Sequence, residues 1–511
     1  MLNLVKSVFL FFFIVFLKSA FSYESVYVKN FIIEGNKSIP SKIIYKIVDP
    51  FKGKYLTFDQ IKSITEKITK IYIENGYITS KAYIPPQDIK DGIVVIKIFE
   101  GKVGNVYIEG SLKYYSRDFI KSFFEPLEGK TLNKNELERV LFLINDFIDL
   151  KVSANLKKGE KPGTTDIYIN AENNEYPFKG AGFYDNWGSE YISKNRYGLN
   201  LNIGNILTEG SILSLTGIMG NTYDDFHTGS ASYQFPVGYS GLKLGALVSV
   251  GNSNIGKELA VLNIKSYSRF YSLYLIYPII KTVNKDLSFI SSFNVVNFEQ
   301  SILGETTRDK YRYIDLSISY TRSNINSQTR IEFIITQGLG KSLDGILGES
   351  SFTTRAGASG DFTKFNLNFI RYQKITDSLF VLFDLKSQYS KNKLVASQNF
   401  YIGGPASIRG YLLSQYGGDS GYSISTELRW SPLKDKEKLQ FISFLETGWV
   451  FLNSKYIGQD RGKSLTGAGF GIRLKLPWKI NLSADLAFPI SPEVDGDDRE
   501  SNFYCQLVKF F

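Results

Sequence analysis

The first third of the chain carries hydrophobic residues at helical spacing between short apolar-rich segments. Segment 58–74 places several apolar residues on one face of a helix, namely Ile61, Ile64, Ile68, Ile71 and Tyr72. A second amphipathic segment spans 41–48, and segments 27–35, 80–84 and 93–99 have the composition and turn flanks of strands. This arrangement predicts the order β-α-α-β-β.

The same order of elements recurs in the next part of the chain. Residues 102–109, 152–157 and 166–171 are predicted strands, and residues 116–124 and 133–150 are predicted helices. Two similarly built units in tandem indicate an internal repeat. The predicted domains are one unit at residues 24–100 and a second at residues 101–175.

Beyond the second unit the period of the pattern changes from helical to alternating. One such segment has its apolar face at Leu379, Val381, Phe383 and Leu385. The segments are about ten residues long, which is the length of a tilted strand that crosses a bilayer. A soluble β-sandwich also alternates, but here one face is aliphatic or aromatic while the other carries Gly, Asn, Asp, Lys and Arg, which favours a barrel with an aqueous lumen.

The fold class predicted for the whole chain is therefore mixed. Two tandem β-α-α-β-β domains precede an antiparallel transmembrane β-barrel at residues 176–511, for which about sixteen strands are expected. The barrel has to be closed, because an open sheet edge in lipid would leave backbone amides unpaired.

The N-terminus has the features of an export signal. Lys6 precedes the apolar run 8–17, and Ala20 and Ser22 are the small residues expected before a cleavage site. The run is too short to cross a bilayer as a helix. A signal peptide at residues 1–22 is therefore predicted, with an N-terminal membrane anchor as the alternative.

Composition excludes several classes of function. The chain of 511 residues has one Cys and one His, which argues against an internal disulfide, a Cys-cluster metal site, a zinc enzyme and Ser–His or Cys–His catalysis. The formal net charge of +10 is modest for this length and does not indicate a nucleic-acid partner. We expect no enzyme activity, no metal and no cofactor.

A distinctive motif follows the second helix of the first unit. Residues 76–88 read Gly-Tyr-Ile-Thr-Ser-Lys-Ala-Tyr-Ile-Pro-Pro-Gln-Asp, and Glu100-Gly101 follows the next strand. Pro85-Pro86 ends strand pairing because proline cannot donate to a ladder, so the prolines on their own indicate only a turn. The stretch as a whole resembles the ShlB-type POTRA domain of the TpsB transporters of two-partner secretion. The motif residues carried over from this resemblance are Tyr77, Tyr83, Pro85, Pro86 and Gln87.

A second motif lies in the long connection 397–420, between the eleventh and twelfth predicted barrel strands. It reads Gly-Gly-Pro-Ala-Ser-Ile-Arg-Gly-Tyr at 403–411. It resembles the loop signature by which TpsB transporters fold their sixth extracellular loop into the lumen, here Ser407, Ile408, Arg409, Gly410 and Tyr411. An arginine inside a barrel is costly unless it is paired, and the resemblance implies Glu446 as the partner, where the family usually has Asp.

The resemblance implies an outer-membrane pore with periplasmic POTRA domains that translocates a large, unfolded, β-helical adhesin or haemolysin to the cell surface. Phe511 ends the last predicted strand as the terminal aromatic by which the barrel assembly machinery recognises its substrates. The alternative is an assembly factor of the same superfamily that inserts other barrels or lipoproteins. Relatives often begin with a pore-plugging helix, for which we expect no room before the first strand.

Overall fold

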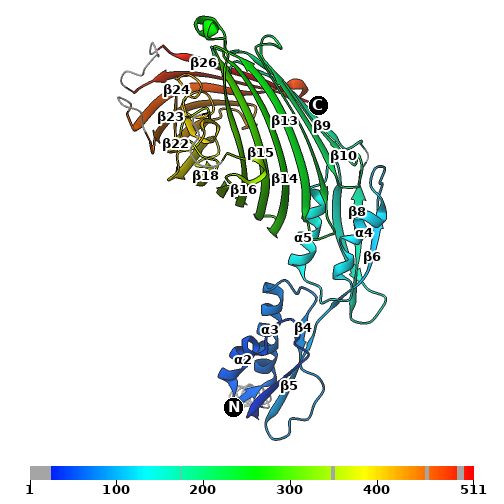
Figure 1. Ribbon diagram of the computed structural model, residues 1–511. Coiled ribbons are helices and arrows are strands. Elements are labelled where there is room, and N and C mark those ends of the chain that lie inside the picture. Colours follow the sequence, from blue (N-terminus) through cyan, green and yellow to red (C-terminus); the bar gives the residue numbers. More distant parts are fainter. Residues whose placement is uncertain (1–24, 174, 347–351, 455–459, 492–499) are drawn as a thin grey trace, which may run out of the picture. The chain divides into compact units, whose positions relative to one another are not determined.

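The computed structural model describes residues 25–173, 175–346, 352–454, 460–491 and 500–511. The expected signal peptide lies outside these residues. Figure 1 shows an N-terminal region of helices and small sheets and a C-terminal region of long strands. Among the described residues, no helix combines the length and apolar character that a membrane span requires.

The first α/β unit contains a three-stranded sheet with two helices. The sheet order is β2-β5-β4, in which β2 runs parallel and β4 antiparallel to the central β5. A separate two-stranded sheet joins β1 and β3. The elements are β1 (Ser25–Val28), β2 (Asn30–Glu34), α2 (Ser41–Val48), η1 (Asp49–Phe51), β3 (Lys54–Thr57), α3 (Phe58–Glu74), β4 (Lys81–Tyr83) and β5 (Ile93–Phe99).

Local sequence explains the limits of helix α3. Thr57 caps its N-terminus and forms a capping box with Gln60, because each side chain accepts a hydrogen bond from the other's backbone. The buried face of α3 includes Ile64 and Ile68 and packs in one core with Phe31 of β2. The helical periodicity of the sequence thus becomes the core-facing side of the helix.

The predicted strand 27–35 is divided in the structure. Lys29 separates β1 from β2, and the backbone N–H groups of Lys29 and Asn30 both donate to the Gly92 carbonyl, at 2.7 and 3.2 Å. The chain changes pairing partner at this point, from β3 to β5. The sequence pattern missed β3, because a four-residue strand shows too few alternations to be recognised.

The second α/β unit repeats the arrangement with a sheet in the order β6-β8-β7. The helices are shorter than predicted, and α5 stops before Asp149, which adopts a positive φ of 54°. The elements are β6 (Lys102–Glu109), α4 (Arg117–Ser122), η2 (Glu125–Leu127), α5 (Lys134–Asn145), β7 (Lys151–Lys158) and β8 (Thr164–Glu172).

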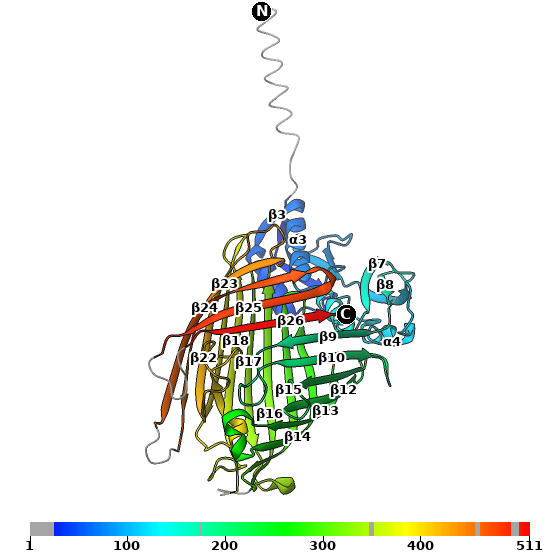
Figure 2. The ribbon, with the colours of Figure 1, turned by 90° about the horizontal axis from the view of Figure 1, so that it is seen from above.

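Sixteen of the remaining strands form a closed antiparallel barrel in the part of the chain that the structure describes, which confirms the predicted fold class. Figure 2 shows β26 beside β9, where Gln506–Phe510 pair with Ala181–Asp185 and close the ring. The strands are β9 (Phe178–Asp185), β10 (Arg196–Gly204), β11 (Ile212–Met219), β12 (Phe226–Pro236), β13 (Lys243–Asn254), β14 (Lys265–Lys281), β15 (Lys285–Ile302), β16 (Glu305–Asn324), β17 (Ser327–Gly338), β18 (Thr363–Lys374), β19 (Leu379–Ser390), β22 (Ser420–Trp430), β23 (Leu439–Phe451), β24 (Gly462–Leu476), β25 (Ile480–Pro489) and β26 (Asn502–Phe510).

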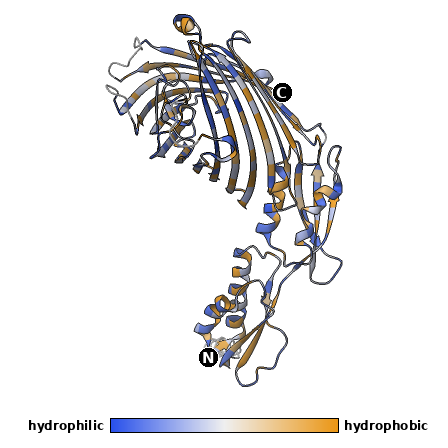
Figure 3. Ribbon diagram, viewed as in Figure 1, coloured by the Kyte–Doolittle hydropathy of each residue, from blue (hydrophilic) through white to orange (hydrophobic). Residues whose placement is uncertain are grey.

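The two faces of the barrel wall differ in polarity. On β16 the outward residues Leu316 and Ile318 are exposed, whereas Ser317 and Ser319, which alternate with them, are buried on the lumen side. Figure 3 shows hydrophobic and hydrophilic residues interleaved along the barrel strands. An apolar outer face and a polar interior are what a barrel needs in lipid.

Candidate functional site

The connection between β19 and β22, residues 391–419, folds into the barrel and is called loop L6 below. It contains the short paired strands β20 (Phe400–Ile402) and β21 (Tyr416–Gly418). Ile408 is fully buried in an apolar cluster of L6 and two wall strands, whose buried members are Ile402, Ile408, Tyr411, Val450 and Leu465. Loop L6 is therefore packed against the wall through apolar as well as polar contacts.

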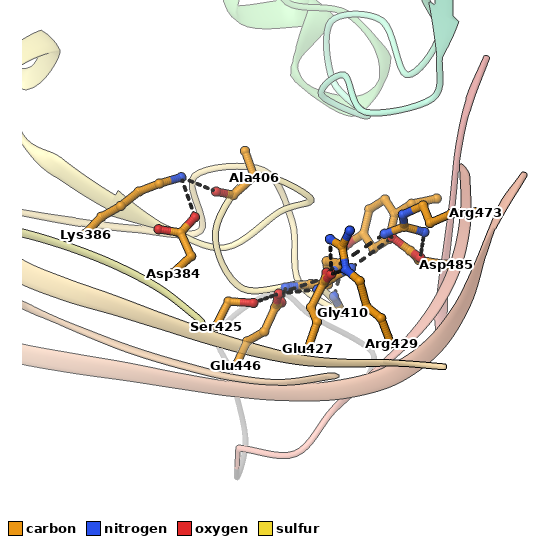
Figure 4. Close-up of polar contacts among 12 residues, drawn as sticks. Asp384, Lys386, Ala406, Gly410, Ser425, Glu427, Arg429, Glu446, Arg473 and Asp485 are labelled. Carbon is orange, nitrogen blue, oxygen red and sulfur yellow. Dashed lines mark hydrogen bonds and ion pairs between the residues drawn. The ribbon is translucent and has the colours of Figure 1, made fainter. Parts of the chain in front are cut away.

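The Arg409 side chain lies at the centre of a buried ionic cluster, and Figure 4 labels the three carboxylates that contact it, Glu427, Glu446 and Asp485. Its Nη2 is 2.6 Å from Glu446 Oε1 and 2.8 Å from Glu427 Oε1, and its Nη1 is 2.9 Å from Asp485 Oδ2. The guanidinium also lies over the Phe444 ring, 3.5 Å from the centroid. These contacts come from β22, β23 and β25, so one side chain connects L6 to three wall strands.

Charge within this cluster is balanced. Arg429 bonds to Glu427 at 2.6 Å, and Arg473 bonds to Asp485 at 2.5 Å. We call the set the arginine cluster; its members are Arg409, Arg429, Arg473, Glu427, Glu446 and Asp485. Three guanidinium groups face three carboxylates, which is the condition under which burying charges is tolerated.

The backbone around Arg409 is held as closely as its side chain. The Arg409 N–H donates to Glu446 Oε2 at 2.7 Å. Gly410 has a φ of 100°, a conformation that favours glycine, and its N–H donates to the Tyr504 hydroxyl. A Cβ at Gly467 would lie 2.2 Å from the Arg409 carbonyl oxygen, so a glycine on β24 is needed for the loop to approach.

The other motif residues have separate contacts. The Tyr411 hydroxyl donates to the Thr466 carbonyl at 2.6 Å and accepts from the backbone of Ile490 and Ser491. The Ser407 hydroxyl is buried without a hydrogen-bond partner among the described residues. Lys386 Nζ donates to the Ala406 carbonyl at 3.3 Å, which adds a contact from β19 (Figure 4).

A second ion pair fixes the C-terminal end of L6. Asp419 is fully buried and pairs with Arg355 of the β17–β18 connection, with Nη2 and Oδ2 3.0 Å apart. Asp419 also accepts backbone hydrogen bonds from Leu394 and Asn453, each at 2.8 Å. Sequence reasoning missed this pair, because its members share no motif and lie 64 positions apart.

The structure brings the expected partner Glu446 to Arg409 and adds two carboxylates that sequence reasoning missed. Asp485 begins the stretch Asp-Leu-Ala-Phe-Pro at 485–489, and Glu427 follows Ser423 and Ser425 with a period of two. Both positions were recognisable as facing the lumen. Whether these two carboxylates contact Arg409 depends on how far L6 enters the barrel. The alternation of apolar and polar residues does not predict that depth.

The POTRA motif residues lie around strand β4. Gln87 pairs its side-chain amide with both backbone groups of Val95 on β5, at 2.8 Å each. This pairing continues the ladder beyond Pro85-Pro86, where the backbone of β4 has ended. Tyr77 packs against Tyr72, with ring centroids 5.9 Å apart, and Tyr83 is exposed.

Phe511 lies at the junction that closes the barrel. Its backbone N–H and carbonyl exchange hydrogen bonds with Gly180 at 3.0 and 3.1 Å, and its ring stacks on Phe178 at 6.0 Å. The aromatic side chain remains about half exposed. The last residue thus extends the β26–β9 contact by one further pair.

Comparison with known proteins identifies the group to which this architecture belongs. Residues 163–474 match the family described as haemolysin secretion/activation protein ShlB/FhaC/HecB, and residues 26–101 match the ShlB-type POTRA domain. The heme/hemopexin transporter protein HuxB of Haemophilus influenzae (strain 86-028NP) is 24% identical over 497 residues, which cover 93% of this chain and 85% of HuxB.

Solved structures show the same fold. CdiB from Escherichia coli superposes with a TM-score of 0.83 at 19% identity, over 96% of this chain and 92% of that one. BamA from Haemophilus ducreyi, lacking POTRA domains 1–3, superposes with a lower TM-score of 0.55 at 17% identity, over 95% of this chain and 100% of that one. The chain therefore belongs to the ShlB/FhaC/HecB family of TpsB proteins and is a non-enzymatic outer-membrane transporter of two-partner secretion with a periplasmic POTRA region.

Proposed function

We propose that this transporter captures a secreted β-helical partner of the adhesin or haemolysin class with its POTRA domains and passes it through the barrel unfolded. The observation that carries the proposal is the occupied lumen. Loop L6 is fixed inside the barrel, and the cavity beside Arg409 has a volume of about 780 Å³. A folded domain is far larger than this space, whereas an extended chain is not.

Partner capture is expected at an open sheet edge. Strand β2 is an edge of its sheet among the described residues, and its Ile32 side chain is exposed. The opposite side of central β5 is covered by β4 and then by the Gln87 amide. An extended segment of the partner can therefore add to β2, with backbone hydrogen bonds providing affinity.

The arginine cluster is proposed to hold the conducting form of the barrel together. Removal of one member of a buried charge network leaves its partners without compensation, so the network favours one position of L6 strongly. Phe511, half exposed at the barrel junction, is proposed as the signal read by the barrel assembly machinery during insertion.

The proposal is tested by secretion of the cognate partner from cells that carry Arg409→Ala. We expect secretion to fall to background while the barrel still inserts, because the cluster loses its central cation. The folded barrel is detected by its heat-dependent mobility on gels. Arg330→Ala on β17 is the matched control, since Arg330 also projects into the lumen but lies outside the cluster.

Normal secretion by Arg409→Ala would refute the role of the cluster. If the variant does not insert, Arg409→Lys keeps the charge and removes only the forked geometry. Secretion by an inserted Arg409→Lys barrel then tests the contacts of the guanidinium with its three carboxylates. If this variant secretes as much partner as the wild type, the proposed role of the arginine cluster is again refuted.

A further inference from the structure

Three basic residues occupy one cross-strand row of the barrel wall. The strand register pairs Lys285 of β15 with Arg322 of β16, Arg322 with Thr329 of β17, and Thr329 with Arg371 of β18. Lys285, Arg322 and Arg371 are all exposed. We call Lys285, Arg322, Thr329 and Arg371 the basic row.

The basic row faces lipid rather than the lumen. Arg322 lies four residues after Ile318, which is 50% exposed on the outer face, and side chains of a strand share a face at every second position. Directly paired residues on neighbouring strands project from the same face. The outward residues Phe333 of β17 and Leu367 of β18 are also exposed and share the faces of Thr329 and Arg371.

The row lies at the periplasmic edge of the wall. The chain enters β9 from the POTRA domains, so β9 runs outward and every second connection returns to the periplasmic side. The turns β14–β15, β16–β17 and β18–β19 are therefore periplasmic. Lys285 begins β15, and Arg322 lies within the last three residues of β16.

The basic row has no carboxylate partner in the part of the chain that the structure describes. Among the described residues, none of the three cations takes part in an ion pair, and Arg371 donates only to neutral oxygens, Thr329 Oγ1 at 3.1 Å and Gln373 Oε1 at 2.6 Å. The periplasmic edge of the wall does not carry such a row on every strand. The outward row at the periplasmic ends of β12 and β13 pairs Phe235 with Leu244, without charge.

We propose that the basic row binds an anionic phospholipid of the inner leaflet through its headgroup phosphates. The row is continuous with the lipid-facing surface of the barrel, so a lipid headgroup is its natural neighbour. Guanidinium groups match the geometry of phosphate oxygens, and the Thr329 hydroxyl adds a donor. A protein partner is not required to explain a row that begins where the apolar wall ends.

The width of the row points to a headgroup with two phosphates. Three strand spacings separate β15 from β18, and at roughly 4.8 Å each they span about 14 Å. One phosphate cannot contact both ends of such a row. Each basic residue at an anionic membrane surface contributes roughly a fivefold gain in affinity, so three contribute on the order of a hundredfold.

The test uses the purified full-length protein in detergent and counts bound lipid by native mass spectrometry. Cardiolipin, phosphatidylglycerol and phosphatidylethanolamine are added separately. Wild type is expected to prefer cardiolipin over phosphatidylethanolamine by about a hundredfold. The triple variant Lys285→Gln, Arg322→Gln, Arg371→Gln should lose this preference.

Arg330→Gln provides the matched control, because Arg330 directly follows Thr329 but projects from the opposite face. It should keep the preference of wild type. Equal selectivity in wild type and the triple variant, or equal loss in Arg330→Gln, would overturn the proposal. Equal binding of phosphatidylglycerol and cardiolipin would overturn the assignment of two phosphates.

Two further outcomes are decisive. If the triple variant does not fold, Arg322→Gln alone removes the central cation and should lower the preference about fivefold; no change would contradict the proposal. If the triple variant binds lipid as wild type does but secretes less partner, the row is a protein contact and the lipid assignment fails.

Discussion

The first POTRA domain and the barrel bury opposite kinds of side chain. In the POTRA domain Phe31, Ile64 and Val94 are almost fully buried, and the charged residues lie outside. In the barrel Arg409 and Glu446 are 4% and 3% exposed, while many apolar side chains of the wall, among them Leu316 and Ile318, face outward. The POTRA interior is stabilised mainly by removal of apolar surface from water, whereas the buried charges of the arginine cluster depend on pairing with one another.

Because of this difference, the same kind of substitution is expected to have different effects on stability in the two regions. An apolar core tolerates changes of hydrophobic side chain better than it tolerates a charge. A paired ionic interior tolerates the loss of both partners better than the loss of one. The POTRA core can therefore be perturbed with a charged side chain, and the arginine cluster with an apolar one.

The largest effect is expected from placing a carboxylate in the POTRA core. Ile64→Asp puts an unpaired charge at a fully buried position of α3, and should lower the free energy of unfolding of that domain by about 4 kcal/mol or more. Limited proteolysis of the full chain should then cleave the first POTRA domain and spare the barrel. Lys62→Asp, at an exposed position of the same helix, should leave the digestion pattern unchanged.

The converse substitution places a hydrocarbon in the ionic interior. Glu446→Leu removes a carboxylate that accepts from both the side chain and the backbone of Arg409, and should destabilise the position of L6 by about 3 kcal/mol. Protease access to L6 from the cell surface measures this loss.

The double variant Arg409→Met, Glu446→Leu sharpens the comparison. It leaves Arg429 with Glu427 and Arg473 with Asp485, so charge remains balanced. The double variant should therefore protect L6 better than Glu446→Leu alone. Equal exposure of L6 in both variants would show that apolar packing, and not charge balance, fixes the loop.

Sequence reasoning located most elements because local signals and tertiary structure agree. Helix α3 has the limits that the periodicity predicted, and β5 and β6 also have the predicted limits. The prediction from sequence was wrong where the chain changes its pairing partner within one predicted strand. At Lys29 the strand divides because two successive N–H groups turn to Gly92, and no residue type marks that change.

The site was predicted less completely than the fold. A motif marked Arg409, and family resemblance pointed to Glu446, but Glu427 and Asp485 were missed. The alternation of apolar and polar residues predicts which side chains face the lumen. It does not predict how far along the barrel axis each side chain lies from a loop that enters from one end. The Arg355–Asp419 pair shows the same limit, since it joins two connections whose paths are set by tertiary packing.

The smallest effect is expected where the POTRA region uses a charge of its own. Glu100 accepts hydrogen bonds from the backbone of Lys37 and Ser38 and from the Tyr72 hydroxyl, each at 2.8 Å. It also accepts from Thr131 of the second domain at 3.3 Å. Burial raises the pKa of Glu100, but these hydrogen bonds, led by those from Ser38, outweigh burial and hold the pKa below its ordinary value.

A lowered folded-state pKa means that ionised Glu100 stabilises the fold above its unfolded pKa, and that this contribution is lost as pH falls through the folded pKa. Glu100→Gln should therefore cost roughly 1 kcal/mol at neutral pH, since the group is partly in contact with water, and the cost should disappear in acid. Hydrogen exchange at the Lys37 and Ser38 amides between about pH 6 and about pH 3 measures the difference.

Glu74→Gln, which removes an exposed pair with Lys70 at 3.9 Å, is the control and should show no such pH dependence. A pH-independent cost in Glu100→Gln would mean that ionisation of Glu100 does not stabilise the POTRA region, which would then gain nothing from this partly buried charge.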